Sequence, residues 1–379
     1  MKGLARSLLI LTLAAVPVGC SKAEPVIKIG VSAPFTGDQA SVGLTVLRGA
    51  QLAVDQANAR GEILPGFKLE LVAIDDSHSP TQAVTAAKKF VSDPEVIGVI
   101  GHLNSSCTKP ASQVYFNARL AQITPASTNP QISRQGFDTF FRICATDDLQ
   151  GPSAAQFALN ELGAKRVFII DDKTTYGKGL SDEFQKTFTS RGGQVLGHEG
   201  ITQGDKDFKP LLTKVRALSP DLIFFGGLYP EASLLIKQTK DLGMGAQILG
   251  GDGIFDVTLI QLATPAAAEG TYATMIGTDV RNLPEAREFV KTYEAQYGDI
   301  GSYSAYSYDA TNILIQAIQL AGARDRVRVI EVLKSGRTFH GILGATEFDD
   351  HGDTKNKVIS VFCVKNGKWE QWISSSSSS

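Results

Sequence analysis

Residues 89–101 read KFVSDPEVIGVIG, and residues 215–227 read VRALSPDLIFFGG. Each stretch ends a helical pattern, turns at a proline and continues as an apolar strand that ends in glycine. Aligning the two prolines also aligns these glycines, and after each strand a loop leads into a new helical pattern. We therefore infer two lobes of similar strand–helix topology. In open α/β sheets, ligands bind beside the carboxyl ends of the strands, so the two loops are expected to face one cleft.

The same alternation of strands and helices runs outward from these stretches over most of the chain. Near-continuous apolar runs predict strands at residues 27–31, 69–74, 96–100, 167–171, 222–225 and 247–250. Helical periodicity fills the gaps at residues 44–58, 81–91, 154–162, 180–190, 208–218 and 232–242. Strands that alternate with helices of this length predict an α/β fold of two Rossmann-like lobes, each a parallel sheet flanked by helices.

The composition is that of an ordinary globular protein. Of the 379 residues, 43% are hydrophobic and 20% are charged, and the formal net charge is −2. This length and composition suffice for two hydrophobic cores of typical domain size. The sequence contains no dense run of Lys and Arg, so nothing in it predicts a nucleic-acid partner.

The N-terminus has the pattern of a signal peptide. Lys2 and Arg6 precede a short apolar run at residues 8–16, and small residues follow it. The run is too short to span a bilayer comfortably, so residues 1–24 are predicted to be a signal peptide that directs export to the periplasm.

Cys20 follows Gly19 at the end of this segment, which is typical of a bacterial lipoprotein cleavage site. Acyl chains on Cys20 would then anchor the mature protein to a membrane. Pro17 departs from the usual lipoprotein pattern, and cleavage with release of an unlipidated protein is the alternative.

The sequence argues against an enzyme. It contains no G-x-S-x-G elbow, P-loop or H-E-x-x-H motif, and its five histidines lack the spacing of metal ligands. His102 and Cys107 are close enough in sequence to suggest a base and its nucleophile, but a strand-to-helix turn separates them. The chain is therefore predicted to have no catalytic residue, metal or cofactor, and a cleft hydrolase is the weaker alternative.

Five segments carry a resemblance to one family. They are residues 28–37 (KIGVSAPFTG), 101–112 (GHLNSSCTKPAS), 123–130 (ITPASTNP), 150–152 (QGP) and 171–179 (DDKTTYGKG). In this order and spacing, the chain resembles the leucine/isoleucine/valine-binding proteins over residues 26–372. These are the type I periplasmic substrate-binding proteins of bacterial branched-chain amino acid ABC transporters. The resemblance implies a monomer that captures an α-amino acid, branched-chain or other, by hinge closure and delivers it to a membrane permease.

The resemblance also implies that the chain crosses three times between its lobes. We place the crossovers near residues 145–148, 276–279 and 353–355. The expected division is 25–146 plus 278–354 for the first lobe and 147–277 plus 355–373 for the second. The serine run at 374–379 has no apolar side chain and is expected to be a disordered or artificial tail.

Ser105 and Ser106 begin a predicted helix, where hydroxyls, backbone N–H groups and the helix dipole can hold a carboxylate. From the residues alone, the alternative is that Ser105 is an ordinary N-cap. The resemblance instead implies that Ser105 grips the carboxylate of the ligand.

Ala126, Ser127 and Thr128 end another predicted strand. The resemblance implies that the Ala126 carbonyl and the Thr128 hydroxyl accept hydrogen bonds from the ligand ammonium, while the Thr128 N–H donates to the carboxylate. The alternative is a turn held by Thr128 and Asn129 ahead of a proline.

Asp252 follows a predicted strand of the second lobe, where the family commonly has Glu or Asp. A carboxylate at this place would pair with the ligand ammonium, and a solvated turn aspartate is the alternative. Tyr176 matches a family tyrosine that covers the ligand, and Tyr229 is offset by one residue from another. Leu228 and Val42 stand where aromatic residues often contact the ligand side chain, which weakens the prediction of leucine.

The sequence leaves further alternatives open. A ligand such as an amide, a urea-like compound or an aromatic acid, or a role as a sensor, would suit the same fold. As in other family members with cysteines in these two segments, Cys107 and Cys144 are expected to form a disulfide, while Cys363 is expected to be a buried thiol. The tyrosines between residues 285 and 333 are expected to pack in the core rather than form a binding cage.

Overall fold

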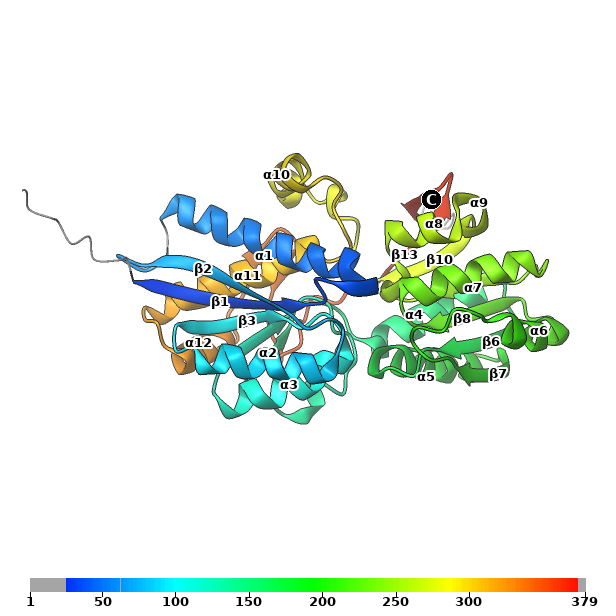
Figure 1. The fold of residues 1–379 in the computed structure, drawn as a ribbon, viewed down its shortest axis with the longest axis horizontal. Coiled ribbons are helices and arrows are strands. Elements are labelled where there is room, and N and C mark those ends of the chain that lie inside the picture. The colour runs from blue at the N-terminus through cyan, green and yellow to red at the C-terminus, as the bar shows by residue number, and fades with distance from the viewer. Residues whose placement is uncertain (1–24, 62, 374–379) are drawn as a thin grey trace, which may run out of the picture.

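Two β-sheets, set end to end along the long axis of the molecule, organise the chain (Figure 1). A computed structural model describes residues 25–61 and 63–373. The predicted signal peptide, the lipidation of Cys20 and the serine run at 374–379 lie outside these residues. Within them, the structure contains no helix that is both long enough and apolar enough to cross a bilayer.

The first sheet has five parallel strands in the order β2-β1-β3-β4-β5. They are β1 (Val26–Ala33), β2 (Lys68–Asp75), β3 (Val96–Gly101), β4 (Ala121–Thr124) and β5 (Phe140–Arg142). The helices around it are α1 (Ala40–Arg60), α2 (Pro80–Ser92), α3 (Ser105–Asn117), α10 (Arg287–Tyr297), α11 (Ser304–Ala321) and α12 (Arg326–Leu333). A small hairpin, β11 (Phe339–Gly341) and β12 (Gly344–Thr346), packs beside α11. We call this assembly lobe 1.

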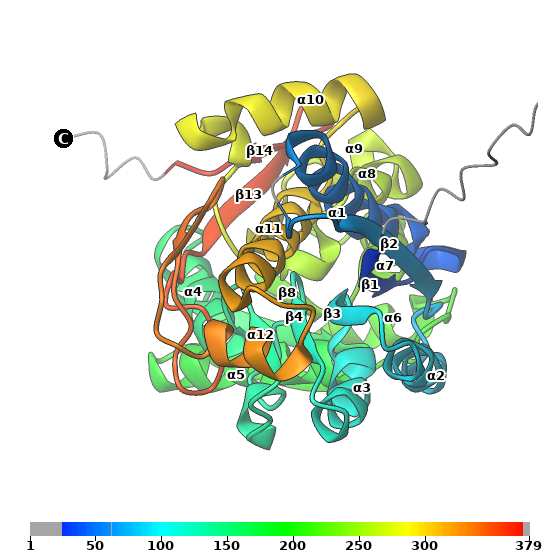
Figure 2. The same cartoon turned by 90° about the vertical axis from the view of Figure 1, so that its left-hand side faces the viewer.

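Helices cover both faces of this sheet, α1 and α11 on one side and α2 and α3 on the other (Figure 2). Two glycines allow the close approach. A Cβ on Gly30 would lie 2.9 Å from the ring of Phe90 in α2, and a Cβ on Gly98 would lie 2.6 Å from Leu314 in α11. The register pairs Gly30 with Val99, the neighbour of Gly98, so the two glycines face opposite sides.

The second sheet has seven strands in the order β14-β13-β10-β9-β8-β6-β7. They are β6 (Arg166–Asp171), β7 (Gln194–Gly200), β8 (Leu222–Gly226), β9 (Gln247–Gly250), β10 (Thr271–Met275), β13 (Ser360–Lys365) and β14 (Lys368–Gln371). Its helices are α4 (Asp147–Asn160), α5 (Thr175–Ser190), α6 (Lys209–Leu218), α7 (Tyr229–Asp241), α8 (Val257–Ala263) and α9 (Pro265–Ala268). We call this assembly lobe 2. In β8, Leu222 and Phe224 pack towards α4 and α5, whereas Ile223 and Phe225 pack towards α6 and α7.

The second sheet confirms the predicted parallel arrangement in β6 to β10, and two antiparallel strands extend it at one edge. β13 runs antiparallel to β10 and forms a hairpin with β14. The turn is formed by Asn366 and Gly367, whose φ angles are 51° and 73°. An Asn-Gly pair with positive φ at both positions is the preferred two-residue hairpin turn, because its twist matches that of the strands.

The chain passes between the two sheets three times: between β5 and α4, between β10 and α10, and between β12 and β13. These passages span residues 143–146, 276–286 and 347–359. The predicted crossovers fall in or next to them, and the domain boundaries drawn from the sequence remain predictions.

Candidate functional site

The loops that follow β3 and β4 in lobe 1 meet loops of lobe 2. Asn129 Nδ2 donates to the carbonyl of Thr175 at 2.6 Å, and the Thr175 N–H donates to Ser106 Oγ at 3.3 Å. A Cβ on Gly179 would lie 2.3 Å from Asn129 Nδ2. These contacts join the carboxyl-end edges of the two sheets, so the predicted site residues of both lobes face each other.

Ser105 is the first residue of α3 and is almost fully buried. Its Oγ accepts a hydrogen bond from the N–H of Asn129 at 3.3 Å. The N-cap of α3 is Asn104, whose side chain makes no capping hydrogen bond, so the alternative of Ser105 as an N-cap is wrong. The first N–H groups of a helix have no partner within it and attract anions.

The segment from Ala126 to Thr128 is buried beside this helix start. The Thr128 hydroxyl has no hydrogen-bond partner among the described residues. In contrast, Ser127 Oγ lies 2.9 Å from the Leu103 carbonyl and 2.6 Å from Thr108 Oγ1. Ser127 therefore ties the segment to lobe 1, and the free polar group is that of Thr128.

Arg142 supports the same segment from behind and is fully buried. Its Nη1 donates to the carbonyls of Ser127 and Asn129, each at 2.9 Å. Its Nε and Nη2 donate to Asp353 Oδ1 at 2.8 and 2.6 Å. The planar guanidinium thereby joins the loop after β4 to the third passage between the lobes.

Asp252 lies at the start of a short 3₁₀ helix after β9 and is 3% exposed. Its Oδ1 accepts hydrogen bonds from Gln150 Nε2 at 3.0 Å and from the Tyr176 hydroxyl at 2.9 Å. Its Oδ2 accepts one from the Tyr303 hydroxyl at 2.8 Å. The alternative of a solvated turn aspartate is therefore wrong, because the carboxylate is buried and accepts hydrogen bonds from three donors.

Burial raises the pKa of Asp252, and the hydrogen bonds from Tyr303, Gln150 and Tyr176 oppose the rise. The pKa values of both tyrosines are themselves raised well above their usual value, first by burial and then by the charge of Asp252. The tyrosines therefore remain protonated donors. A buried carboxylate at such a contact between two lobes favours a cationic partner.

The sequence does not indicate two of these donors. Its pattern predicts core packing for Tyr303, yet this residue lies at the N-cap of α11 in lobe 1 and donates to Asp252 in lobe 2. Gln150, on α4, belongs to a segment that resembles the family but carries no predicted role. No local pattern marks either residue, because each contacts a partner more than 50 positions away.

Tyr229 has a different position from Tyr176. It is the first residue of α7, and its hydroxyl donates to the backbone carbonyl of Asp38 in lobe 1. Ser302 of lobe 1 likewise donates to the Phe255 carbonyl of lobe 2. Such bonds between the lobes are made only when the lobes are together, so the structure represents a closed arrangement.

The predicted disulfide is wrong. Cys107 and Cys144 are free thiols, as is Cys363. Cys107 is buried on the side of the first sheet covered by α2 and α3, whereas Cys144 belongs to a different hydrophobic cluster. Each lies among apolar neighbours, and burial raises the pKa of both thiols.

We therefore expect three thiols to react with a thiol reagent when a protein of residues 25–373 is denatured without reductant. In the native protein the reaction should be slow, because all three sulfurs are buried and little thiolate forms. Titration before and after denaturation checks this. A count of one thiol after denaturation would restore the disulfide.

The suspected pair of His102 and Cys107 is not a nucleophile with its base. His102 Nδ1 lies 2.7 Å from Asp76 Oδ2, and Nε2 lies 3.1 Å from the Tyr115 hydroxyl. Both ring nitrogens are thus occupied by other groups, and the ring is fully buried. Nor do the described residues contain a group of three or more His, Cys, Asp or Glu side chains arranged to hold a metal ion.

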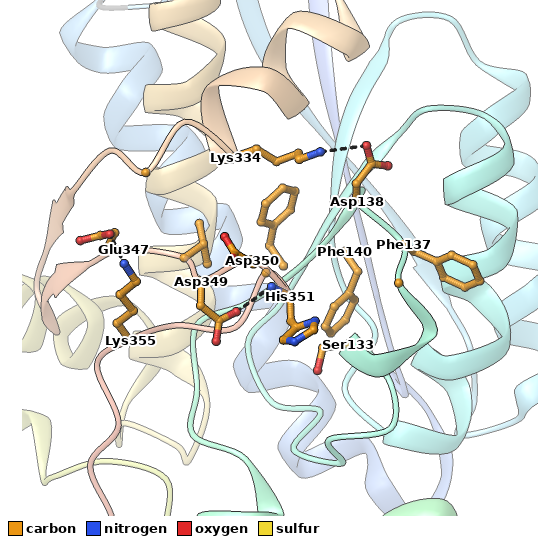
Figure 3. Close-up of a pocket in the computed structure, with 15 residues that line it drawn as sticks. Ser133, Phe137, Asp138, Phe140, Lys334, Glu347, Asp349, Asp350, His351 and Lys355 are labelled. Atoms are coloured by element: carbon orange, nitrogen blue, oxygen red, sulfur yellow. Dashed lines mark hydrogen bonds and ion pairs between the residues drawn. The ribbon is translucent and has the colours of Figure 1, made fainter.

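A cavity of about 340 Å³ lies elsewhere, beside the third passage between the lobes (Figure 3). Lys334, which pairs with Asp138, and Lys355, which pairs with Glu347, are on its wall. None of the residues predicted to bind ligand lines this cavity. The candidate site is therefore the buried contact between the lobes.

Comparison with known proteins identifies relatives over most of the chain. Residues 26–368 match the family described as periplasmic binding protein. The chain is 39% identical to an amino acid binding protein of Pseudomonas aeruginosa, over 90% of this chain and 91% of that one. It is 38% identical to a Leu/Ile/Val-binding protein homolog of Brucella suis, over 90% of both.

Solved structures show the same fold. The leucine binding protein LivK of Thermotoga maritima matches with a TM-score of 0.85 and 34% identity, covering 92% of this chain and 98% of that one. The substrate-binding protein LivJ of Streptococcus pneumoniae, in complex with isoleucine, matches with a TM-score of 0.84 and 28% identity, covering 91% and 98%. The first is described as a leucine binding protein and the second as the substrate-binding protein of a branched-chain amino acid transporter.

Proposed function

The chain belongs to the periplasmic binding protein family, and from this premise we propose that it is the substrate-binding component of an ABC importer for branched-chain amino acids. Its relatives are Leu/Ile/Val-binding proteins, with isoleucine in the LivJ structure. The observation that carries the proposal is Asp252, a buried carboxylate of lobe 2 at the contact with lobe 1, where the start of α3 also meets lobe 2. The two ends of a zwitterion need such an arrangement, with anion donors on one side and a carboxylate on the other.

The ligand carboxylate would be bound at the start of α3, by the hydroxyl of Ser105 and by backbone N–H groups, including that of Thr128. The ligand ammonium would donate to the Ala126 carbonyl, to the unpartnered Thr128 hydroxyl and to Asp252. Tyr176 holds Asp252 in place and also accepts a hydrogen bond from the N–H of Gly253 at 2.9 Å.

An aliphatic side chain suits the remaining wall. Leu228 is buried, and its Cδ2 would lie 2.9 Å from a Cβ on Gly253. The departure from an aromatic residue at this place thus leaves an apolar surface next to Asp252. An aromatic acid or an amide would leave the carboxylate of Asp252 without a cationic partner.

Closure of the lobes would capture the ligand. The bonds of Asn129 to Thr175 and of Tyr303 to Asp252 join the lobes only in the closed arrangement. A ligand that contacts both lobes adds free energy to that state and shifts the equilibrium towards it. We further propose that the protein acts as a monomer outside the cytoplasmic membrane and delivers its ligand to a permease, with Cys20 as its lipid anchor.

Isothermal titration with a ligand panel tests the proposal. L-Leucine, L-isoleucine or L-valine is expected to bind at least about a hundredfold more tightly than benzoate or an α-hydroxy acid, because those lack the ammonium. Tight binding of a carboxylate without an amino group, unchanged in the Asp252→Ala variant, would refute the proposal.

A further inference from the structure

Asp147 is a second buried carboxylate at the proposed ligand site. It is the first residue of α4 and follows the first passage between the lobes, and its side chain is fully buried. Its backbone N–H donates to the carbonyl of Thr128 at 3.0 Å, which places it directly beside the segment that is proposed to bind the ammonium.

By distance and angle, neither side-chain oxygen of Asp147 has a hydrogen-bond partner among the described residues, and the one nearby donor is the Thr128 hydroxyl, which lowers its pKa. A buried carboxylate without donors is costly, and native proteins rarely leave one so. Thr128, the neighbour that could serve it, is also without a partner at its hydroxyl. A carboxylate and a hydroxyl, each with unused hydrogen-bonding capacity, therefore lie next to each other at the contact between the lobes.

Compared with Asp147, Asp252 has few lone pairs left to accept further hydrogen bonds. It already accepts three hydrogen bonds, and each carboxylate oxygen has two lone-pair positions. An ammonium group has three N–H bonds to donate. Of the two acids, Asp147 has the greater unused capacity for them.

The charges around Asp147 are also unbalanced. Burial raises the pKa of Asp147 well above its usual value, and the negative charge of Asp252 raises it further. The Thr128 hydroxyl and the positive charge of Arg142 lower this pKa, while the negative charge of Asp148 raises it. Arg142 offers little compensation, because its guanidinium is bound to Asp353 and to backbone carbonyls. A cation of external origin fits this place.

We propose that Asp147 is a direct acceptor for the ligand ammonium, so that two carboxylates, Asp147 and Asp252, hold it from opposite sides. This inference rests on the proposed function and extends it. It gives the buried carboxylate of Asp147 the donors that the described residues do not supply. It also makes the amino group, rather than the side chain, the part of the ligand that the cleft selects most strongly.

The test compares Asp147→Asn with Asp148→Asn, a neighbouring, partly exposed acid paired with Arg134. Each protein is titrated with L-leucine and with its α-hydroxy analogue, which keeps the carboxylate and side chain but lacks the ammonium. Asp147→Asn is expected to weaken leucine binding by roughly 10- to 100-fold and to leave the analogue within about twofold. Asp148→Asn should leave both within about twofold.

Binding of the analogue also reports on folding, since it requires the same closed cleft. Equal losses for both ligands would assign Asp147 a structural role and overturn the inference, as would leucine binding within twofold of the unaltered protein. If the unaltered protein binds leucine no better than the analogue, the proposed function fails and the inference fails with it.

Discussion

Replacement of Asp252 by alanine is expected to weaken L-leucine binding by at least about a hundredfold. The carboxylate is 3% exposed and is the acceptor for Gln150, Tyr176 and Tyr303. In the variant, the ligand ammonium would be buried opposite a cavity, and the three donors would lose their shared partner. Isothermal titration with leucine measures the effect.

Two further variants make the result specific. Asp252→Asn keeps the shape and should still lose most of the affinity, because the negative charge is gone. Asp241→Ala removes an exposed carboxylate at the end of α7 and should leave binding unchanged. A loss below about tenfold in Asp252→Ala, equivalent to about 1.4 kcal/mol, would contradict the proposed pairing.

The Arg142→Met variant is expected to lose about 3–5 kcal/mol of the free energy of unfolding. Arg142 is fully buried, and it satisfies Asp353 together with the carbonyls of Ser127 and Asn129. Methionine fills a similar volume but leaves buried Asp353 with only the hydrogen bond from Ser133, and it leaves the Ser127 carbonyl without its donor. Urea denaturation followed by circular dichroism gives the free energy of unfolding.

Arg119→Met provides the matched control. Arg119 pairs with Asp138 at the surface, where the side chains are 40% and 31% exposed. Such a pair contributes about 0–1 kcal/mol, so this variant should unfold almost as the unaltered protein does. If Arg142→Met were no less stable than Arg119→Met, the buried network would not support the loop after β4.

The secondary structure followed from local sequence, with errors that have local causes. All six predicted strands are present within two residues at each end, as β1, β2, β3, β6, β8 and β9. The largest error is at α4, which starts at Asp147 rather than near residue 154. Gly151 and Pro152 read as helix breakers, yet Pro152 lies in the second turn, where it removes only one early hydrogen bond.

The candidate site was predictable only in part. The positions of Ser105, Thr128 and Asp252 predict ligand binding, because each follows a strand at the edge where α/β sheets bind ligands. Their individual roles could not be read from the same pattern. Ser127 is occupied by lobe 1, and Tyr229 contacts a backbone carbonyl of the opposite lobe. The predicted disulfide is wrong for the same reason, because sequence position does not tell which face of the sheet a cysteine occupies.

The sequence by itself determined the strand–helix alternation, the repeat of one pattern in two lobes and the family, because these depend on periodicity and on motifs in order. Only the tertiary structure decided what surrounds Asp252. Its three donors, Gln150, Tyr176 and Tyr303, are 102, 76 and 51 positions away. It also decided that the Asp147 carboxylate is buried without a hydrogen bond of good geometry among the described residues. Burial and hydrogen bonding depend on which distant segments two folded sheets bring together, and no local pattern contains that information.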